Sequence, residues 1–89
     1  MMNEIYLAKS EKIEGLHTVR LGGLSVEGCK VSIDTYQVKW LTTTGGYDEP
    51  HHEITWVIDP KGGRWFRKTI FRTYLNPEPP KTEEFKKLF

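Results

Sequence analysis

The segment from Ile54 to Leu75 constrains the fold of this 89-residue chain most strongly. Up to Ile58 it alternates large apolar residues with Thr and Val, a period of two that is typical of a strand. The sequence Asp59-Pro60-Lys61-Gly62-Gly63 follows, and its proline and glycines favour the backbone angles of a tight turn. A second alternating run covers residues 64–75. We therefore predict a β-hairpin around which the other strands assemble.

The second strand of this hairpin divides its side chains between two faces, because successive residues of a strand point to opposite sides. The odd positions are the better core candidates, with Arg67 as the misfit: Trp65, Arg67, Thr69, Phe71, Thr73 and Leu75. The even positions interleave cations with apolar side chains: Arg64, Phe66, Lys68, Ile70, Arg72 and Tyr74.

This even face has the composition of a surface that binds single-stranded nucleic acid, with cations for phosphates and rings for base stacking. Residues 61–75 hold five basic residues and no acidic residue. The alternative is structural: the apolar side chains pack inside, while the cations reach water or pair with acids on a neighbouring strand. The candidate binding residues are Lys61, Arg64, Phe66, Arg67, Lys68, Arg72 and Tyr74.

Charge is distributed unevenly along the chain, although the net charge is only +1. Residues 1–60 hold five Lys or Arg and nine Asp or Glu, whereas residues 76–89 hold three of each. The positive charge is thus concentrated in residues 61–75. The sequence pI near 7.9 argues against a dedicated nucleic-acid-binding domain, for which a pI above about 9 is usual.

The preceding residues predict a meander of short strands with glycine corners. We expect strands at residues 3–8 and 17–26, a charged connection at 9–15, a break or bend at Gly22-Gly23 and a turn at Glu27-Gly28. Residues 29–43 fit either a strand with a bulge near Asp34 or a helix that begins after Ser32. Their β-branched content favours the strand.

The C-terminal residues predict a stiff linker and a short helix. Three prolines within residues 76–80 favour an extended chain. Thr82 is a suitable helix N-cap, acids follow it, and apolar residues recur at helical spacing. We therefore expect one β domain over residues 1–75, a Pro-rich linker over 76–80 and a capping helix over 81–89.

The predicted fold is mainly β: a small antiparallel barrel or curved sheet of five or six strands, closed by the C-terminal helix. It is similar in size and layout to SH3-type barrels, a likeness of fold that transfers no function. Cys29 should be a small packed side chain. The predicted core comprises Ile5, Leu7, Val19, Leu21, Val31, Val38, Trp40, Ile54, Trp56, Ile58, Trp65 and Phe71.

Residues 44–53 predict an acidic loop that forms a second candidate site, with Asp48, Glu49, His51, His52 and Glu53. Adjacent histidines on an extended chain point to opposite sides, and the histidine and cysteine spacings of zinc sites are absent from the sequence. We therefore expect neither a metal nor another cofactor. A metal-independent ribonuclease that uses His51 or His52 as a base is a weaker hypothesis.

The function that the sequence favours is a non-catalytic binding module for nucleic acid. The alternative is a protein-binding inhibitor or accessory protein, of the kind that phages encode, which blocks a larger enzyme or assembly. The single cysteine fits a reducing compartment or sets no constraint at all, and neither an apolar run of membrane-spanning length nor a secretory signal is evident. We expect a cytoplasmic protein without membrane contact, either a monomer or a homodimer that pairs through a sheet edge.

Overall fold

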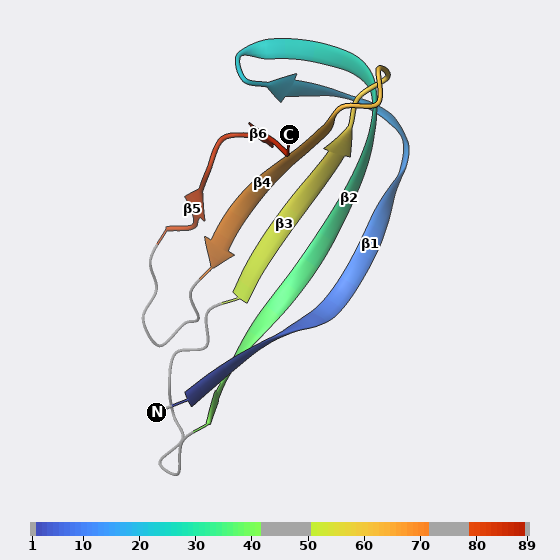
Figure 1. The fold of residues 1–89 in the computed structure, drawn as a ribbon. Helices are drawn as coiled ribbons and strands as arrows, with labels where there is room; N and C mark the ends of the chain where they lie inside the picture. Colours follow the sequence, from blue (N-terminus) through green and yellow to red (C-terminus); the bar gives the residue numbers. More distant parts are fainter. Residues whose placement is uncertain (1, 42–50, 72–78, 89) are drawn as a thin grey trace.

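A computed structural model describes residues 2–41, 51–71 and 79–88 of the chain (Figure 1). In the first of these ranges, side chains are described for residues 5–38. They form one antiparallel sheet with the strand order β1-β2-β3-β4-β5, and β6 also pairs with β4. The strands are β1 (Met2–Leu21), β2 (Leu24–Leu41), β3 (His51–Ile58), β4 (Arg64–Phe71), β5 (Lys81–Thr82) and β6 (Lys86–Lys87). The prediction of a mainly β, antiparallel fold is confirmed.

The described strands form an open sheet, so of the two predicted forms, a barrel or a curved sheet, the barrel was wrong. β1 lies at one edge of the sheet, and β5 and β6 lie at the other, beyond β4. Closure would require these two edges to meet. Instead, the short C-terminal strands cover the free edge of β4 within the same chain.

The predicted C-terminal helix is also not formed in residues 81–88. These residues run beside β4 instead and include the short strands β5 and β6 (Figure 1). The backbone N–H groups of Glu83 and Leu88 donate to the carbonyls of Lys68 and Arg64, both at 3.0 Å. A helix of about two turns is marginal in water on its own. The edge of β4 instead offers backbone N–H and C=O groups, and pairing with them provides hydrogen-bond partners for the backbone of residues 81–88.

The first two strands form one long hairpin. Gly22 and Gly23 have φ values of +57° and +91°, and Leu21 pairs with Leu24. Two positive φ angles in a two-residue loop characterise the turn that reverses a hairpin, so this glycine pair reverses the chain rather than bending one strand. The predicted connection at residues 9–15 is likewise part of β1.

Residues 29–41 are strand, as the β-branched content favoured, and the helical alternative was wrong. The register between β2 and β3 is continuous from Lys30 to Gln37, so the predicted bulge near Asp34 is absent. The irregularities lie between β1 and β2 instead, where pairing shifts around Ala8, Gly15 and Gly28. Gly15 and Gly28 have φ values of +83° and +78°, which other residues rarely adopt.

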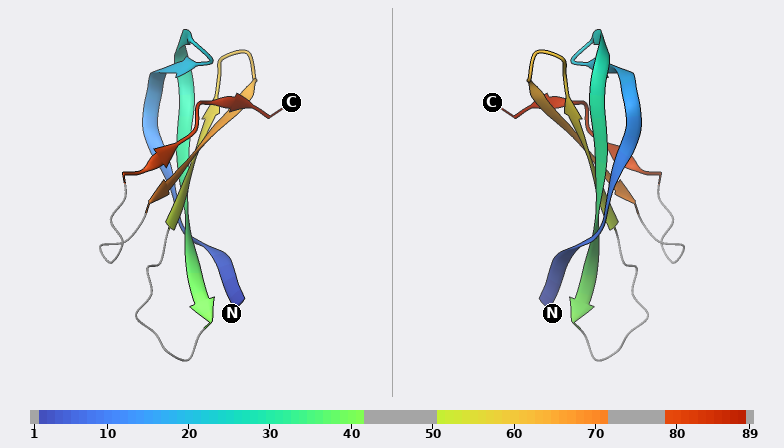
Figure 2. Two further views of the ribbon diagram at one scale, coloured as in Figure 1. Left: turned by 90° about the vertical axis from the view of Figure 1, so that its left-hand side faces the viewer. Right: turned by 90° about the vertical axis from the view of Figure 1, so that its right-hand side faces the viewer.

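The tip of the β1–β2 hairpin curls back over one face of the sheet, beyond the end of its pairing with β3 (Figures 1 and 2). The fully buried side chains of Leu21, Cys29 and Val57 meet there. Trp65 of β4 and Phe85 of the C-terminal segment pack against them. The core therefore joins the hairpin tip, the sheet and the C-terminus, and the predicted burial of Cys29 is confirmed.

The predicted core was correct at some positions and wrong at others. Leu21 and Val38 are buried, and Val19, Val31 and Trp65 pack on the core cluster. Ile5, Leu7 and Ile58 are instead 59%, 51% and 42% exposed. Ile54 and Trp56 are half-buried on the opposite face from Val57, which is 1% exposed. The side chain of Trp40 lies outside the described residues.

Candidate binding face on the central sheet

The pairing of β2, β3 and β4 decides which side chains share a face, because directly opposed residues of antiparallel strands point to the same side. One side, the core face, carries Val31, Val57 and Trp65. The other side, the outer face, consists of four rows of registered residues: Lys30–Ile58–Arg64, Ser32–Trp56–Phe66, Asp34–Ile54–Lys68 and Tyr36–His52–Ile70.

A network of hydrogen bonds fixes the aromatic centre of the outer face. The Trp56 Nε1–H donates to Asp34 Oδ2 at 2.9 Å, and the Ser10 hydroxyl donates to Asp34 Oδ1 at 2.6 Å. The Trp56 and Phe66 rings lie with their centroids 5.9 Å apart at an angle of 44°. A ring held by both a hydrogen bond and a neighbouring ring has little freedom to lose on binding a ligand.

Positive charge borders these rings. Lys30 and Arg64 are exposed, Lys68 is half-buried, and the carboxylate in the same rows, that of Asp34, is already engaged by Ser10 and Trp56. Burial, followed by the positive charges of Lys68 and His51, lowers the pKa of His52 below its ordinary value of 6.5. His52 is therefore neutral at pH 7, and the cations of the outer face are those of lysine and arginine.

The outer face also exposes aliphatic side chains. Ile58 is 42% exposed beside Arg64. Ile5 and Leu7, at 59% and 51% exposed, extend the same side along β1, since they pair with Val38 and Tyr36. Ile5 and Leu7 lie at the end of the outer face opposite Ile58, and a partner that covers the whole face would bury all three side chains.

The β3–β4 turn holds the two strands in this register. The Asp59 carboxylate accepts the backbone N–H of Lys61 and of Gly63, both at 2.9 Å, and the indole N–H of Trp65 at 3.0 Å. The hydrogen bond from Trp65, then that from Gly63, lowers the pKa of Asp59. This carboxylate fastens the turn to Trp65 of the core face.

The predicted binding residues do not all come together. Arg64, Phe66 and Lys68 share the outer face, and Lys61 is exposed in the adjoining turn. Arg67 lies on the core face, where its guanidinium sits 4.7 Å from the centre of the Phe85 ring. Arg72 and Tyr74 lie outside the described residues.

The predicted loop site is divided in the same way. His51, His52 and Glu53 belong to β3 rather than to a loop, because they pair with both β2 and β4. His51 stacks on Phe71 with ring centroids 4.7 Å apart, on the core face, and His52 points to the outer face. Asp48 and Glu49 lie outside the described residues.

Comparison of the chain with protein-family models, curated proteins and solved structures finds no match. Within residues 2–41, 51–71 and 79–88, no helix is long and apolar enough to cross a membrane. The same residues hold no group of three or more His, Cys, Asp or Glu side chains arranged to ligate a metal ion. The function is therefore argued from the site alone.

Three outer-face residues were missed as site candidates: Trp56, Tyr36 and Asp34. Trp56 was assigned to the core because Ile54 and Ile58, at the same parity, make a strong apolar pattern. A signal was present, however. A turn over residues 59–63 makes Ile58 the partner of Arg64, which places Trp56 beside Phe66 on the basic face.

Proposed function

We propose that this protein is a non-catalytic binding module that takes up single-stranded nucleic acid on its outer face. The observation that carries the proposal is the gathering of Tyr36, Trp56 and Phe66 among Lys30, Arg64 and Lys68 on one sheet surface. Unpaired bases of any sequence can stack on aromatic rings, while lysine and arginine neutralise the phosphates between the bases. A duplex hides its bases and should bind more weakly.

The protein would act in the cytoplasm, where a reducing environment suits its buried free thiol. Cys29 is fully buried, and burial together with the negative charge of Asp59 raises the pKa of its thiol. A neutral, inaccessible thiol is a poor nucleophile, so the proposal gives it a packing role.

The test is the salt dependence of binding, measured by fluorescence anisotropy with labelled single-stranded and duplex DNA. The variant Arg64→Gln/Lys68→Gln should lower the slope of log Kd against log salt by about two, because two phosphate contacts are lost. The control Lys9→Gln/Arg20→Gln removes the same charge. Lys9 pairs with Thr35 on the core-face side and Arg20 lines a cavity there.

Equal effects of the two double variants would show that net charge, rather than the outer face, governs binding. Absence of binding even at low salt would contradict the proposal. A single-stranded RNA oligonucleotide, incubated with the protein and separated on a denaturing gel, tests the ribonuclease alternative. We expect it to remain intact.

A protein partner is the second candidate function, and the exposed aliphatic side chains favour it. Ile5, Leu7 and Ile58 contribute little to stacking but would be buried in a protein interface. An inhibitor or accessory protein that covers the outer face would use them together with Trp56, since tryptophan is enriched at interface hot spots. Ile58→Ala should then weaken partner binding and leave oligonucleotide binding nearly unchanged.

A further inference from the structure

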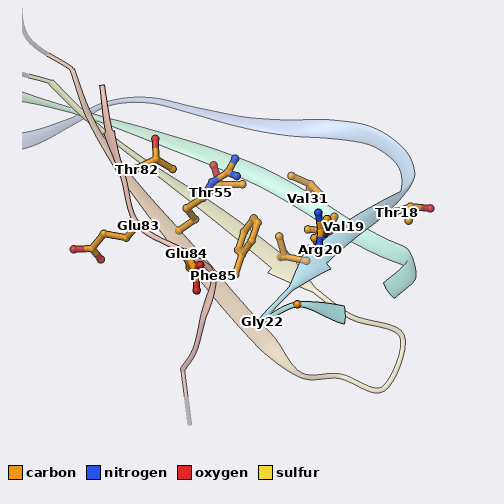
Figure 3. Close-up of a pocket in the computed structure, with 13 residues that line it drawn as sticks. Thr18, Val19, Arg20, Gly22, Val31, Thr55, Thr82, Glu83, Glu84 and Phe85 are labelled. Atoms are coloured by element: carbon orange, nitrogen blue, oxygen red, sulfur yellow. The ribbon is translucent and has the colours of Figure 1, made fainter. Parts of the chain in front are cut away.

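A further candidate site lies on the core face, and the thickness of the sheet separates it from the outer face. It is a cavity of about 680 Å³ between the tip of the β1–β2 hairpin and the C-terminal segment (Figure 3). This volume is within the range of about 300–1,000 Å³ that is typical of small-molecule sites. Its lining includes the apolar side chains of Val19, Val31, Val57 and Phe85 and, from the central strands, Thr55 and Arg67.

Arg67 supplies the charged group of this cavity. Its side chain is half-buried, and its Nε is buried without a hydrogen-bond partner among the described residues. The guanidinium lies over the Phe85 ring at 4.7 Å. The attraction between the cation and the ring face leaves the terminal N–H groups of the guanidinium able to donate to a ligand.

Because the Nε atom itself is buried, the terminal NH2 groups of Arg67 are the donors that face a ligand in the cavity. Each of these two groups points one N–H in the same direction, so two oxygens of a carboxylate fit them as a pair. The other charged side chains around the cavity are exposed, namely Arg20, Glu83 and Glu84. Glu83 extends away from the cavity (Figure 3), and among the charged side chains of the lining only Arg67 is half-buried.

We propose that this cavity binds a small organic carboxylate with an apolar body. The carboxylate pairs with Arg67, and the apolar body packs on Val19, Val31, Val57 and Phe85. Because Phe85 belongs to the C-terminal segment, the bound ligand also holds that segment against the sheet. The site is independent of nucleic-acid binding on the opposite face.

The test is an NMR titration that follows the arginine side-chain Nε–H signals, with benzoate as the probe. Benzoate should shift the Arg67 signal saturably, with a Kd of about 1 mM, the scale expected of so small a ligand. The backbone amides of Thr55 and Phe85 should move with it. Benzamide, which has the same ring without the charge, should shift the Arg67 signal far less.

Three variants separate recognition from general charge. Arg67→Gln and Lys9→Gln each remove one positive charge, and only the first should abolish benzoate binding. Arg67→Lys keeps the charge but lacks the planar pair of donors, so it should weaken binding about tenfold or more. If Arg67→Gln fails to fold, the comparison of benzoate with benzamide on the unaltered protein decides. Equal shifts from both probes, or no saturable shift at Arg67, would overturn the proposal.

Discussion

The core face and the outer face of the β3–β4 hairpin are made by alternate residues of the same two strands, yet they differ in chemistry. The core face carries Val57 and Trp65 under the hairpin tip, and its arginine, Arg67, is half-buried against Phe85. The outer face carries Arg64 and Lys68 around rings that the described residues leave partly open.

The two tryptophans of the hairpin differ in the same way, although each donates its indole N–H to an aspartate. Trp65 donates to Asp59, whose carboxylate also binds the backbone of the β3–β4 turn. Trp56 donates to Asp34, which lies within strand β2. Trp65 is packed into the core cluster, and Trp56 lies in the face with exposed neighbours. Aromatic content alone therefore does not mark a core, since the same residue type packs into the core on one face and lies partly open on the other.

The largest effect should be on stability, and it should differ between Val57 and Ile58, which are neighbours that point to opposite faces. Val57→Ala removes two buried methyl groups and should lower the free energy of unfolding by about 2 kcal/mol. Ile58→Ala, at a position 42% exposed, should cost about 1 kcal/mol or less. Urea denaturation followed by tryptophan fluorescence measures both. Equal losses would mean that the two faces are packed alike.

The next effect concerns binding rather than stability. Trp56→Ala should weaken single-stranded DNA binding roughly tenfold to a hundredfold, because stacking on one ring contributes about 1–3 kcal/mol per base. Trp65→Phe, on the core face, is the matched control and should lower thermal stability while leaving affinity unchanged. Anisotropy titrations and thermal melts on both variants provide the measurements. Loss of affinity in Trp65→Phe alone would reverse the assignment of the faces.

A smaller effect is expected at the turn. The pKa of Asp59 lies below the ordinary value near 3.8, so its carboxylate stabilises the fold above that pH and the contribution disappears as pH falls through the folded-state pKa. Asp59→Asn should therefore lower the melting temperature at pH 7 and change it less at pH 3. Melting temperatures across this range test the prediction. A pH-independent difference would show that the charge is unimportant.

The smallest effect is expected at His52. Its pKa is lowered in the folded state, so the unfolded chain binds the extra proton more readily and stability falls as pH drops below 6.5. His52→Gln should flatten this part of the profile. Denaturation midpoints between about pH 5 and pH 7, bracketing the ordinary histidine pKa, measure the change. An unaltered slope would assign the loss of stability to other groups.

The sequence predicted the β3–β4 hairpin, its turn and the alternation of β4 correctly, because proline, glycine and charged residues occupy positions with strong local preferences. It misplaced Ile54, Trp56 and Ile58, whose apolar pattern is stronger than that of Thr55 and Val57. Local hydrophobicity could not decide between the two faces of β3. The register across the turn decides it, and the core forms where the hairpin tip arrives.

The C-terminus and β1 were misassigned for a related reason. Thr82 and the acids after it have the local features of a helix start, but the free edge of β4 outcompetes a helix this short. The charged residues 9–15 resemble a connection, yet pairing with β2 keeps them in β1. Both outcomes depend on a partner strand, which no local pattern encodes.

Single-stranded nucleic acid should bind to the outer face and not to the core face. The most direct measurement follows the indole N–H signals of Trp56 and Trp65 by NMR during titration with oligothymidylate of about 12 nucleotides, within the usual site size per domain. We expect a saturable, salt-sensitive shift of the Trp56 signal and little change at Trp65. A shift at Trp65 with none at Trp56, or no shift of either signal at low salt, would contradict this expectation.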